Sequence, residues 1–283
     1  MPRYVSDDDE PLEDRTAALT LRNKRTERLK RKHATRQQKR DAVVNLTKLP
    51  TELLLESLKY LEPRDVFSCS LVNRRLLGLV SANATVIGNA IIQRRYSILA
   101  QCFPKPRLLA DLEPHVRALL TDPNRQTQLS IHKRPYQHIQ SPDASELCTC
   151  LTCILTWNNL GLVLDFAHWQ QNLDTGEPIP VIARGTTPEW NVELVARNAR
   201  IARKAVDDSL WYARILEVHL DSTRRSITRH GNNKGNKRIH VAMTQPDADS
   251  GTDGFLAKHG PPSIEFPYQR DEYYMLYDEH LGP

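Results

Sequence analysis

The sequence contains few cysteines and no long apolar run. Five cysteines among 283 residues form a low and odd number, which argues against a disulfide framework and for a reducing compartment. No apolar run approaches the length of about 18 residues that a membrane-spanning helix needs. The acidic N-terminus also differs from the charged and then apolar pattern of a secretory signal peptide. We therefore expect an intracellular protein with no membrane partner.

Signatures of common enzyme classes are also missing. The sequence contains no G-x-x-x-x-G-K-[ST], G-x-S-x-G or H-E-x-x-H motif, so nucleotide hydrolases, serine hydrolases and zinc proteases lack support. It contains no internal repeat with a period of about 20–50 residues, which leaves WD40 and leucine-rich repeat domains unsupported. We predict that the protein is not an enzyme and needs no cofactor, and we nominate no catalytic residue. An enzyme without a recognisable motif in the C-terminal region remains an alternative.

The charge of the chain is concentrated near its N-terminus. The formal net charge is +5, but residues 1–14 carry six acidic side chains and one basic side chain, and residues 15–45 carry eleven basic and two acidic ones. These segments contain too few large apolar residues to offset the entropy that ordering costs. We predict that residues 1–45 form a disordered tail, acidic at first and then basic.

The basic segment 22–40 has good helix formers but almost no apolar stripe, which predicts a helix surrounded by solvent. Three interpretations are open: a nuclear-import signal, a solvated linker helix, or an arm that binds nucleic acid. The segment has no aromatic residue on which a base could stack, so nucleic acid is disfavoured as a partner. The first interpretation predicts a protein of the nucleus and cytoplasm, with this import signal: Lys24, Arg25, Lys30, Arg31 and Lys32.

The next stretch, residues 46–85, predicts three short helices. Pro50 suits the start of a helix, because proline lacks an N–H that would be unpaired there. This helix should end at Glu62, since Pro63 keeps the preceding residue out of the helical region and can itself open a second helix. Asn73 can cap the third helix. One face of the first helix is apolar, with leucines at helical spacing: Leu54, Leu58 and Leu61.

This stretch closely resembles the F-box motif, in the order Leu49-Pro50-x-Glu52-Leu53-Leu54-x3-Leu58-x2-Leu61-x-Pro63-x-Asp65-Val66-x4-Leu71-Val72-x-Arg74-Arg75-Leu76. The resemblance implies a three-helix module that docks on the Skp-type adaptor of an SCF (cullin–RING) ubiquitin ligase. By position, it implies these adaptor-binding residues: Leu49, Pro50, Leu53, Leu54, Leu58, Leu61, Val66, Leu71, Val72 and Leu76.

One residue of this stretch departs from the family pattern. Leu76 stands where F-box proteins usually have tryptophan or phenylalanine, so we expect weaker adaptor binding than a large aromatic anchor would give. An alternative is that these helices are an ordinary hairpin of a larger core, because leucines at helical spacing usually pack inside a protein. A unit this small cannot bury its own leucines, so either interpretation requires a partner surface.

Residues 86–140 are predicted to be a helical linker region. The pattern indicates a helix over residues 86–103, which Pro104 stops, and a shorter one over residues 112–120. Residues 124–143 are polar and interrupted by Pro135 and Pro142, so we predict a long loop or a domain boundary there.

The most apolar part of the chain is the segment 145–174, which predicts a central buried helix with a possible break near residues 158–161. Three of its residues are cysteines, which are typical ligands of zinc and iron–sulfur clusters. On a continuous helix, Cys148 and Cys150 would lie on opposite sides, so these two and Cys153 could not hold one ion. We therefore predict packed thiols and no metal, with His168 as the single candidate for a fourth ligand in the disfavoured metal interpretation.

Residues 141–283 are predicted to form a helical C-terminal module that binds a protein substrate. Its pattern indicates helices over residues 189–206 and 208–230 and a short β-like run over residues 238–243. Residues 90–280 are also similar to the C-terminal region of a group of filamentous-fungal F-box proteins. The predicted fold is mainly α, with a three-helix F-box, long loops and little β structure.

The predicted function follows from the F-box resemblance: a substrate-receptor subunit of an SCF ubiquitin ligase that links a protein substrate to the Skp-type adaptor. The alternative is a nuclear scaffold or nucleic-acid-associated protein that uses the basic segment 22–40.

Overall fold

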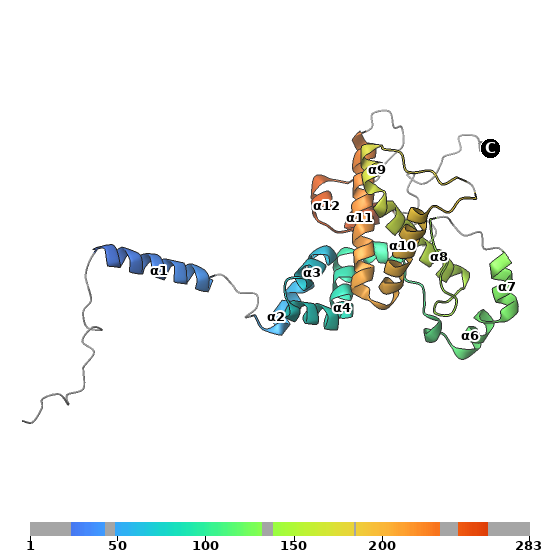
Figure 1. The fold of residues 1–283 in the computed structure, drawn as a ribbon, viewed down its shortest axis with the longest axis horizontal. Coiled ribbons are helices and arrows are strands. Elements are labelled where there is room, and N and C mark those ends of the chain that lie inside the picture. The colour runs from blue at the N-terminus through green and yellow to red at the C-terminus, as the bar shows by residue number, and fades with distance from the viewer. Residues whose placement is uncertain (1–23, 43–48, 132–137, 184, 233–242, 260–283) are drawn as a thin grey trace, which may run out of the picture. The chain divides into compact units, whose positions relative to one another are not determined.

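The computed structural model describes residues 24–42, 49–131, 138–183, 185–232 and 243–259. Over these residues the chain forms twelve α-helices and two short 3-10 helices, with no strand and one isolated antiparallel bridge between Leu108 and Leu147. The predicted mainly-α class is confirmed (Figure 1). The predicted β-like run lies outside the described residues, apart from Met243.

The chain divides into two compact units, residues 1–50 and 51–283. The described part of the first unit contains helix α1 (Lys24–Ala42), which agrees with the predicted helix in the basic segment. Of the tail predicted to be disordered, residues 1–45, the structure describes only residues 24–42, which form α1; residues 1–23 and 43–45 lie outside the described residues. All further elements belong to the second unit.

The second unit begins with three helices, and its first helix is shorter than predicted. Helix α2 (Thr51–Leu58) ends at Leu58, where the backbone changes to tighter hydrogen bonds such as Lys59 N–H to the Glu56 carbonyl (3.2 Å). The predicted end at Glu62 is therefore wrong, because these turns end the helix before the chain reaches Pro63. Helix α3 (Pro63–Ser70) starts at its proline as predicted.

Helix α4 (Arg74–Arg95) is longer than the predicted third helix. Asn73 caps it as predicted, because its side-chain oxygen accepts a hydrogen bond from the Leu76 N–H (2.8 Å). A non-helical residue, Asn83, kinks the helix, and helix α5 (Ser97–Cys102) follows after a break at Tyr96. The helix predicted over residues 86–103 is thus divided, and its first half continues the three-helix stretch without a linker.

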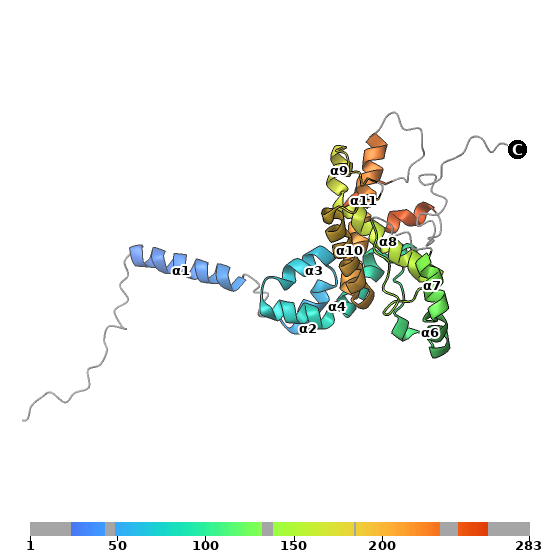
Figure 2. The same ribbon diagram turned by 45° about the vertical axis from the view of Figure 1, so that its right-hand side comes forward.

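Helix α11 (Ser209–Asn232) forms the centre of the second unit. It contacts α3, α4, α10 (Glu189–Asp207) and α8 (Leu151–His168), and Figures 1 and 2 both show α10 and α8 beside it. The helices predicted over residues 189–206 and 208–230 correspond to α10 and α11. Gly88 of α4 permits a close approach to α11, because a Cβ atom there would lie 2.3 Å from the Ser209 carbonyl carbon.

Helix α4 is long and apolar, and part of it is buried. By length and composition α4 could cross a membrane, although the sequence contains no uninterrupted apolar run of that length. Its apolar residues Ile87 and Ile91 are completely buried, and the helix packs on α3 and α11. Such an apolar helix is typical of a protein core.

The apolar segment 145–174 is divided differently from the prediction. Helix α8 begins only at Leu151, with Cys150 as its N-cap residue, and runs through Gly161 without a break. The chain then interrupts its helix at Trp169 and continues in α9 (Gln170–Thr175). The break predicted near residues 158–161 is wrong, because Gly161 provides space against Ile139 rather than a bend.

The predicted linker region contains more helix than expected. Helix α6 (Pro114–Leu120) agrees with the prediction over residues 112–120, but the predicted loop includes α7 (Pro123–Ile131). Its start follows a recognisable signal that the prediction missed: Pro123 occupies the first turn, and the Asp122 carboxylate accepts the N–H groups of Asn124 (2.9 Å) and Arg125 (3.1 Å).

The last described segment returns to the corner between α4 and α5. It contains α12 (Gln245–Asp249) and a 3-10 helix, η4 (Gly254–His259), whose Phe255 and Leu256 are buried. The carboxylate of Asp253 accepts the N–H groups of Ile98 and Leu99, both at 2.8 Å. This contact caps α5 and closes the core beside the three-helix stretch.

Candidate functional site

Helices α2–α4 expose several large apolar side chains. Leu53 is 55% exposed, Leu71 is 85% exposed and Val72 is 71% exposed. Leu77, which the motif did not nominate, is also exposed. Apolar side chains gathered at a protein surface mark an interaction site.

One contact brings these exposed residues towards the same end of the helices. The Arg75 guanidinium lies 3.5 Å from the Thr51 hydroxyl, so the start of α2 lies beside the start of α4. Leu71 and Val72 form the turn immediately before α4, and Leu53 lies in the first turn of α2. We call Leu53, Leu71, Val72 and Leu77 the exposed apolar patch.

The structure separates the ten residues nominated from the motif into three groups. Four side chains are buried inside the second unit: Leu54, Leu58, Val66 and Leu76. Leu61 and Leu49 are half-buried, and Pro50 is exposed. Only Pro50 and three members of the exposed apolar patch are therefore open to a partner in this structure. The motif spacing did not distinguish these groups, because the same helices present one face to the core and another to solvent.

The comparisons with known proteins bear on this part of the chain. Residues 46–83 match the family model of the F-box domain. These residues form an F-box domain. No curated protein matches the chain, and no solved structure matches it. F-box domains generally bind Skp-type adaptors, and the exposed apolar patch lies within this domain. Because the family match ends at residue 83, the similarity to fungal C-terminal regions stays a prediction.

The F-box packs directly on the rest of the second unit. The carboxylate of Glu217, on α11, accepts hydrogen bonds from the Arg64 N–H (3.1 Å) and the Arg214 guanidinium (2.7 Å). Burial raises the pKa of Glu217, and the charge of Arg214 opposes this increase. The Phe67 ring lies 4.8 Å from the Trp211 ring. These contacts fix the F-box against α11.

A cleft of about 960 Å³ lies between α8, α10 and the segment 140–147. Its wall combines aromatic and charged side chains: Trp157, His168, Trp190, Arg197, Arg200 and Glu146. Arg203 crosses the edge of the cleft and pairs with Glu146 of the segment and Asp207 of α10. The cleft therefore has both apolar rings and cationic groups with which to contact a ligand.

One histidine of this cleft, His168, has a lowered pKa. Burial, followed by repulsion from the Arg197 guanidinium, lowers the pKa of His168. The Arg197 guanidinium lies 3.1 Å from the His168 Nδ1 atom, so a neutral imidazole can accept its hydrogen bond. Beside it, the Trp169 and Trp190 rings meet edge to face with their centres 5.8 Å apart.

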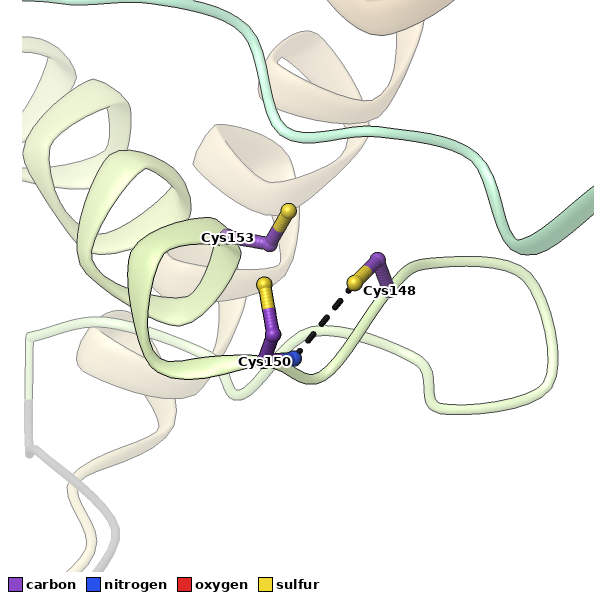
Figure 3. Close-up of side chains that lie close together, drawn as sticks. All are labelled: Cys148, Cys150 and Cys153. Carbon is purple, nitrogen blue, oxygen red and sulfur yellow. Dashed lines mark hydrogen bonds between the residues drawn. The ribbon is translucent and has the colours of Figure 1, made fainter. Parts of the chain in front are cut away.

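The three cysteines of the apolar segment lie close together (Figure 3). The Sγ atoms of Cys148, Cys150 and Cys153 are all within 4.8 Å of one another. The prediction that these thiols cannot converge is wrong, because Cys148 and Cys150 precede α8 instead of lying on a continuous helix. His168, at the far end of α8, is not part of this cluster.

The environments of these thiols differ. Burial raises the pKa of Cys153 to about 12. Partial burial acts to raise the pKa of Cys150, but hydrogen bonds from the Cys153 backbone, from the Cys148 and Cys153 side chains and from the Thr152 backbone together lower it. All five cysteines of the chain lie in the described residues, and none forms a disulfide.

The predicted import signal lies on α1. The side chains of Arg25, Lys30, Arg31 and Lys32 are all exposed. Lys24 is the first residue of α1, and its side chain lies outside the described part of the chain. The accessible basic groups agree with the helix surrounded by solvent that the sequence predicts.

Proposed function

We propose that this protein is a substrate-receptor subunit of an SCF-type ubiquitin ligase. The F-box domain at residues 46–83 carries the proposal, because F-box domains generally bind Skp-type adaptors. The protein would act without a catalytic site of its own, by holding a protein substrate near the ubiquitin-charged enzyme. Its contribution to the rate would be proximity and orientation.

The adaptor interface would use the exposed residues rather than all the nominated ones. Leu53, Leu71 and Val72 offer large apolar side chains, and Pro50 immediately precedes α2. The buried Leu54, Leu58, Val66 and Leu76 would hold the helices that present these residues. Apolar anchors that become buried in an interface each contribute more than about 1 kcal/mol when they are central to it.

The substrate would bind the C-terminal module, where the cleft between α8 and α10 offers a concave surface. Its aromatic rings suit apolar side chains, and Arg197 and Arg200 suit acidic ones. Because α3 and α4 pack directly on α11, this cleft would be held in one orientation relative to the adaptor. A fixed orientation would favour particular lysines of the substrate as ubiquitin acceptors.

The test is direct binding of the purified full chain to a purified Skp-type adaptor. We expect the double variant Leu53→Asp, Leu71→Asp to bind at least about 100-fold more weakly, because it places two charges in an apolar interface. Leu54 stays unchanged, since its substitution would damage the F-box core.

The matched control is the double variant Leu119→Asp, Val181→Asp, which alters two exposed apolar residues outside the F-box. It should bind the adaptor like the wild type. Circular dichroism and thermal unfolding establish that each variant is folded. The proposal fails if the folded wild type does not bind the adaptor, or if both double variants bind equally well.

A second candidate function rests on the exposed basic side chains of α1, which suit an import receptor or a nucleic acid. We propose that α1 directs the protein to the nucleus as well as the cytoplasm. Replacing Lys30, Arg31 and Lys32 by alanine should shift a fluorescent fusion towards the cytoplasm. Salt-sensitive binding to a nucleic-acid duplex that disappears when residues 22–40 are deleted would instead support the scaffold alternative.

A further inference from the structure

We propose that Cys148, Cys150 and Cys153 form a metal site that binds one Zn²⁺ ion through three thiolates. The site lies outside the F-box and is independent of the proposed ligase function. In metal binding, the three thiol protons would pass to solvent and the sulfur atoms would each donate an electron pair to the ion. No oxidant or reductant is needed.

The positions of the three sulfur atoms fit this chemistry. A Zn–S bond is about 2.3 Å long, which places neighbouring sulfur atoms about 3.8 Å apart around a tetrahedral ion. The Sγ atoms lie within 4.8 Å of one another, so closing around an ion requires a contraction of about 1 Å at most. Small rotations of the cysteine side chains can supply this change. Figure 3 shows the three thiols gathered on one side of the first turn of α8.

Backbone groups hold two of the sulfur atoms in place. The Arg107 N–H lies 3.5 Å from the Cys153 sulfur, and the Cys150 N–H lies 3.5 Å from the Cys148 sulfur. Such groups around a site orient its ligands and stabilise the negative charge of thiolates. Cys150 is the N-cap of α8, so the positive end of the helix dipole also favours thiolates at this position.

The surroundings of the cluster provide both a dry side and an open side. Leu109 and Leu120 are buried with Cys148 and Cys153, and they exclude water from one side of the sulfur atoms. Cys150 is only half-buried, which leaves a route for the ion and a place for a water molecule as the fourth ligand.

The loop that carries the first two cysteines is anchored by a separate contact. The Arg125 guanidinium donates hydrogen bonds to the Thr149 hydroxyl (3.0 Å) and the Thr149 carbonyl (2.9 Å). Thr149 lies between Cys148 and Cys150, so α7 holds this loop independently of the thiols. The positive charge of Arg125 also partly balances the net negative charge of a trithiolate zinc site.

A bound ion would stabilise one wall of the cleft. Several residues shortly before Cys148 line the cleft opposite α10: Gln140, Ser141, Asp143, Glu146 and Leu147. An ion shared by Cys148, Cys150 and Cys153 would connect this segment to the start of α8, a helix that lines the cleft further along, through Trp157 and His168. Metal binding would thus fix the shape of the candidate substrate site.

A disulfide between Cys150 and Cys153 is the competing chemistry. A C-x-x-C pair at the start of a helix is typical of redox sites as well as zinc sites. A disulfide uses two thiols and leaves Cys148 without a role, although the structure places the third sulfur beside the pair with its own N–H contact. The convergence of three sulfur atoms therefore favours a metal ion.

The test uses the full chain, purified with a phosphine reductant and freed of metal by a chelator. We expect it to take up one Zn²⁺ ion per chain, measured by mass spectrometry of the intact protein and by elemental analysis. Co²⁺ should produce thiolate-to-cobalt charge-transfer absorption, which Zn²⁺ then removes. Added Zn²⁺ should also raise the unfolding temperature.

The variant Cys150→Ser should weaken Zn²⁺ binding at least about tenfold and remove most of the charge-transfer absorption. Cys150 is the least buried of the three, so this variant should retain the helical circular dichroism signal. The control Cys69→Ser, which changes a half-buried thiol on α3, should bind Zn²⁺ like the wild type. Zn²⁺ binding that survives in Cys150→Ser, a wild type that takes up no ion, or a disulfide formed in place of binding would each overturn the proposal.

Discussion

The F-box and the C-terminal module use apolar side chains in different ways. In the F-box, Leu54 is 3% exposed while its neighbour Leu53 is 55% exposed, so one short helix divides its leucines between the core and the surface. In the module, the apolar residues of α11 that include Leu210 and Leu216 are buried. The module also exposes single apolar side chains such as Val181, but its cleft is lined by aromatic and charged groups.

This difference shows which kind of partner each region can accept. Burying exposed leucines against a complementary apolar surface stabilises the complex by roughly 25 cal/mol for each Å² of apolar area buried. A cleft with Arg197 and Trp190 selects a ligand by charge and shape instead. The exposed apolar patch therefore suits a partner with a complementary apolar surface. The cleft suits a ligand whose charge and shape match its arginines and aromatic rings.

The largest expected effect separates the two kinds of leucine in the F-box. Leu54→Ala should lower the free energy of unfolding by about 2–4 kcal/mol, because it leaves a cavity in the core. Leu53→Ala should change it by less than about 0.5 kcal/mol, because this side chain already contacts water. Urea unfolding followed by circular dichroism measures both values. Equal losses for the two variants would contradict the division between core and surface.

The second prediction concerns the contact between the two regions. Gly88→Ala should lower the free energy of unfolding by about 1–3 kcal/mol, because its Cβ atom would collide with the Ser209 backbone. Gly78, also on α4, has no atom within 4 Å of the equivalent position. Gly78→Ala should therefore raise stability by about 0.5–1 kcal/mol. If Gly88→Ala is as stable as the wild type, α4 and α11 do not pack as described.

A smaller effect should follow from a histidine in the module. Burial lowers the pKa of His219, which packs on the Phe103 ring, to about 4. The unfolded chain takes up this proton near pH 6.5, so stability contributed by neutral His219 is present above that pH and is lost as the pH falls towards 4. Between pH 7 and pH 5 we expect a loss of about 1–2 kcal/mol from this residue.

The control for this pH dependence compares two histidine variants by urea unfolding at each pH. His219→Gln should flatten the decrease in stability between pH 7 and pH 5. His115→Gln, which alters an exposed histidine on α6, should retain it. Identical pH profiles for the two variants would show that His219 titrates in the folded protein as it does in the unfolded chain.

The smallest effect should appear in the cleft itself. Arg197→Gln should raise the pKa of His168, because the substitution removes the repulsion between the guanidinium and a protonated imidazole. An NMR titration of the histidine ring signals measures this pKa. Arg200→Gln serves as the control, and it should leave the His168 pKa closer to the wild-type value. A larger shift in the control would place the electrostatic partner of His168 elsewhere.

Residues with a strong local effect on the backbone were the most predictable from the sequence. Pro63 and Asn73 marked the starts of α3 and α4 correctly, since a missing N–H and a capping side chain act within one turn of helix. Asp122 and Pro123 carried the same kind of signal for α7, which the prediction missed within a polar stretch. The end of α2 was predicted incorrectly from Pro63, because the tighter turns that end the helix begin at Lys59, before the proline.

By itself, the sequence determined the mainly-α fold, the F-box and the positions of most helices, because these depend on helical spacing, prolines and caps that act locally. Only the tertiary structure decided which motif leucines stay exposed, how closely α4 meets α11 at Gly88, and where α8 begins. Because α8 begins only at Leu151, Cys148 and Cys150 precede the helix and lie beside Cys153. Burial and convergence depend on contacts between residues far apart in the chain, and a one-dimensional pattern does not contain them.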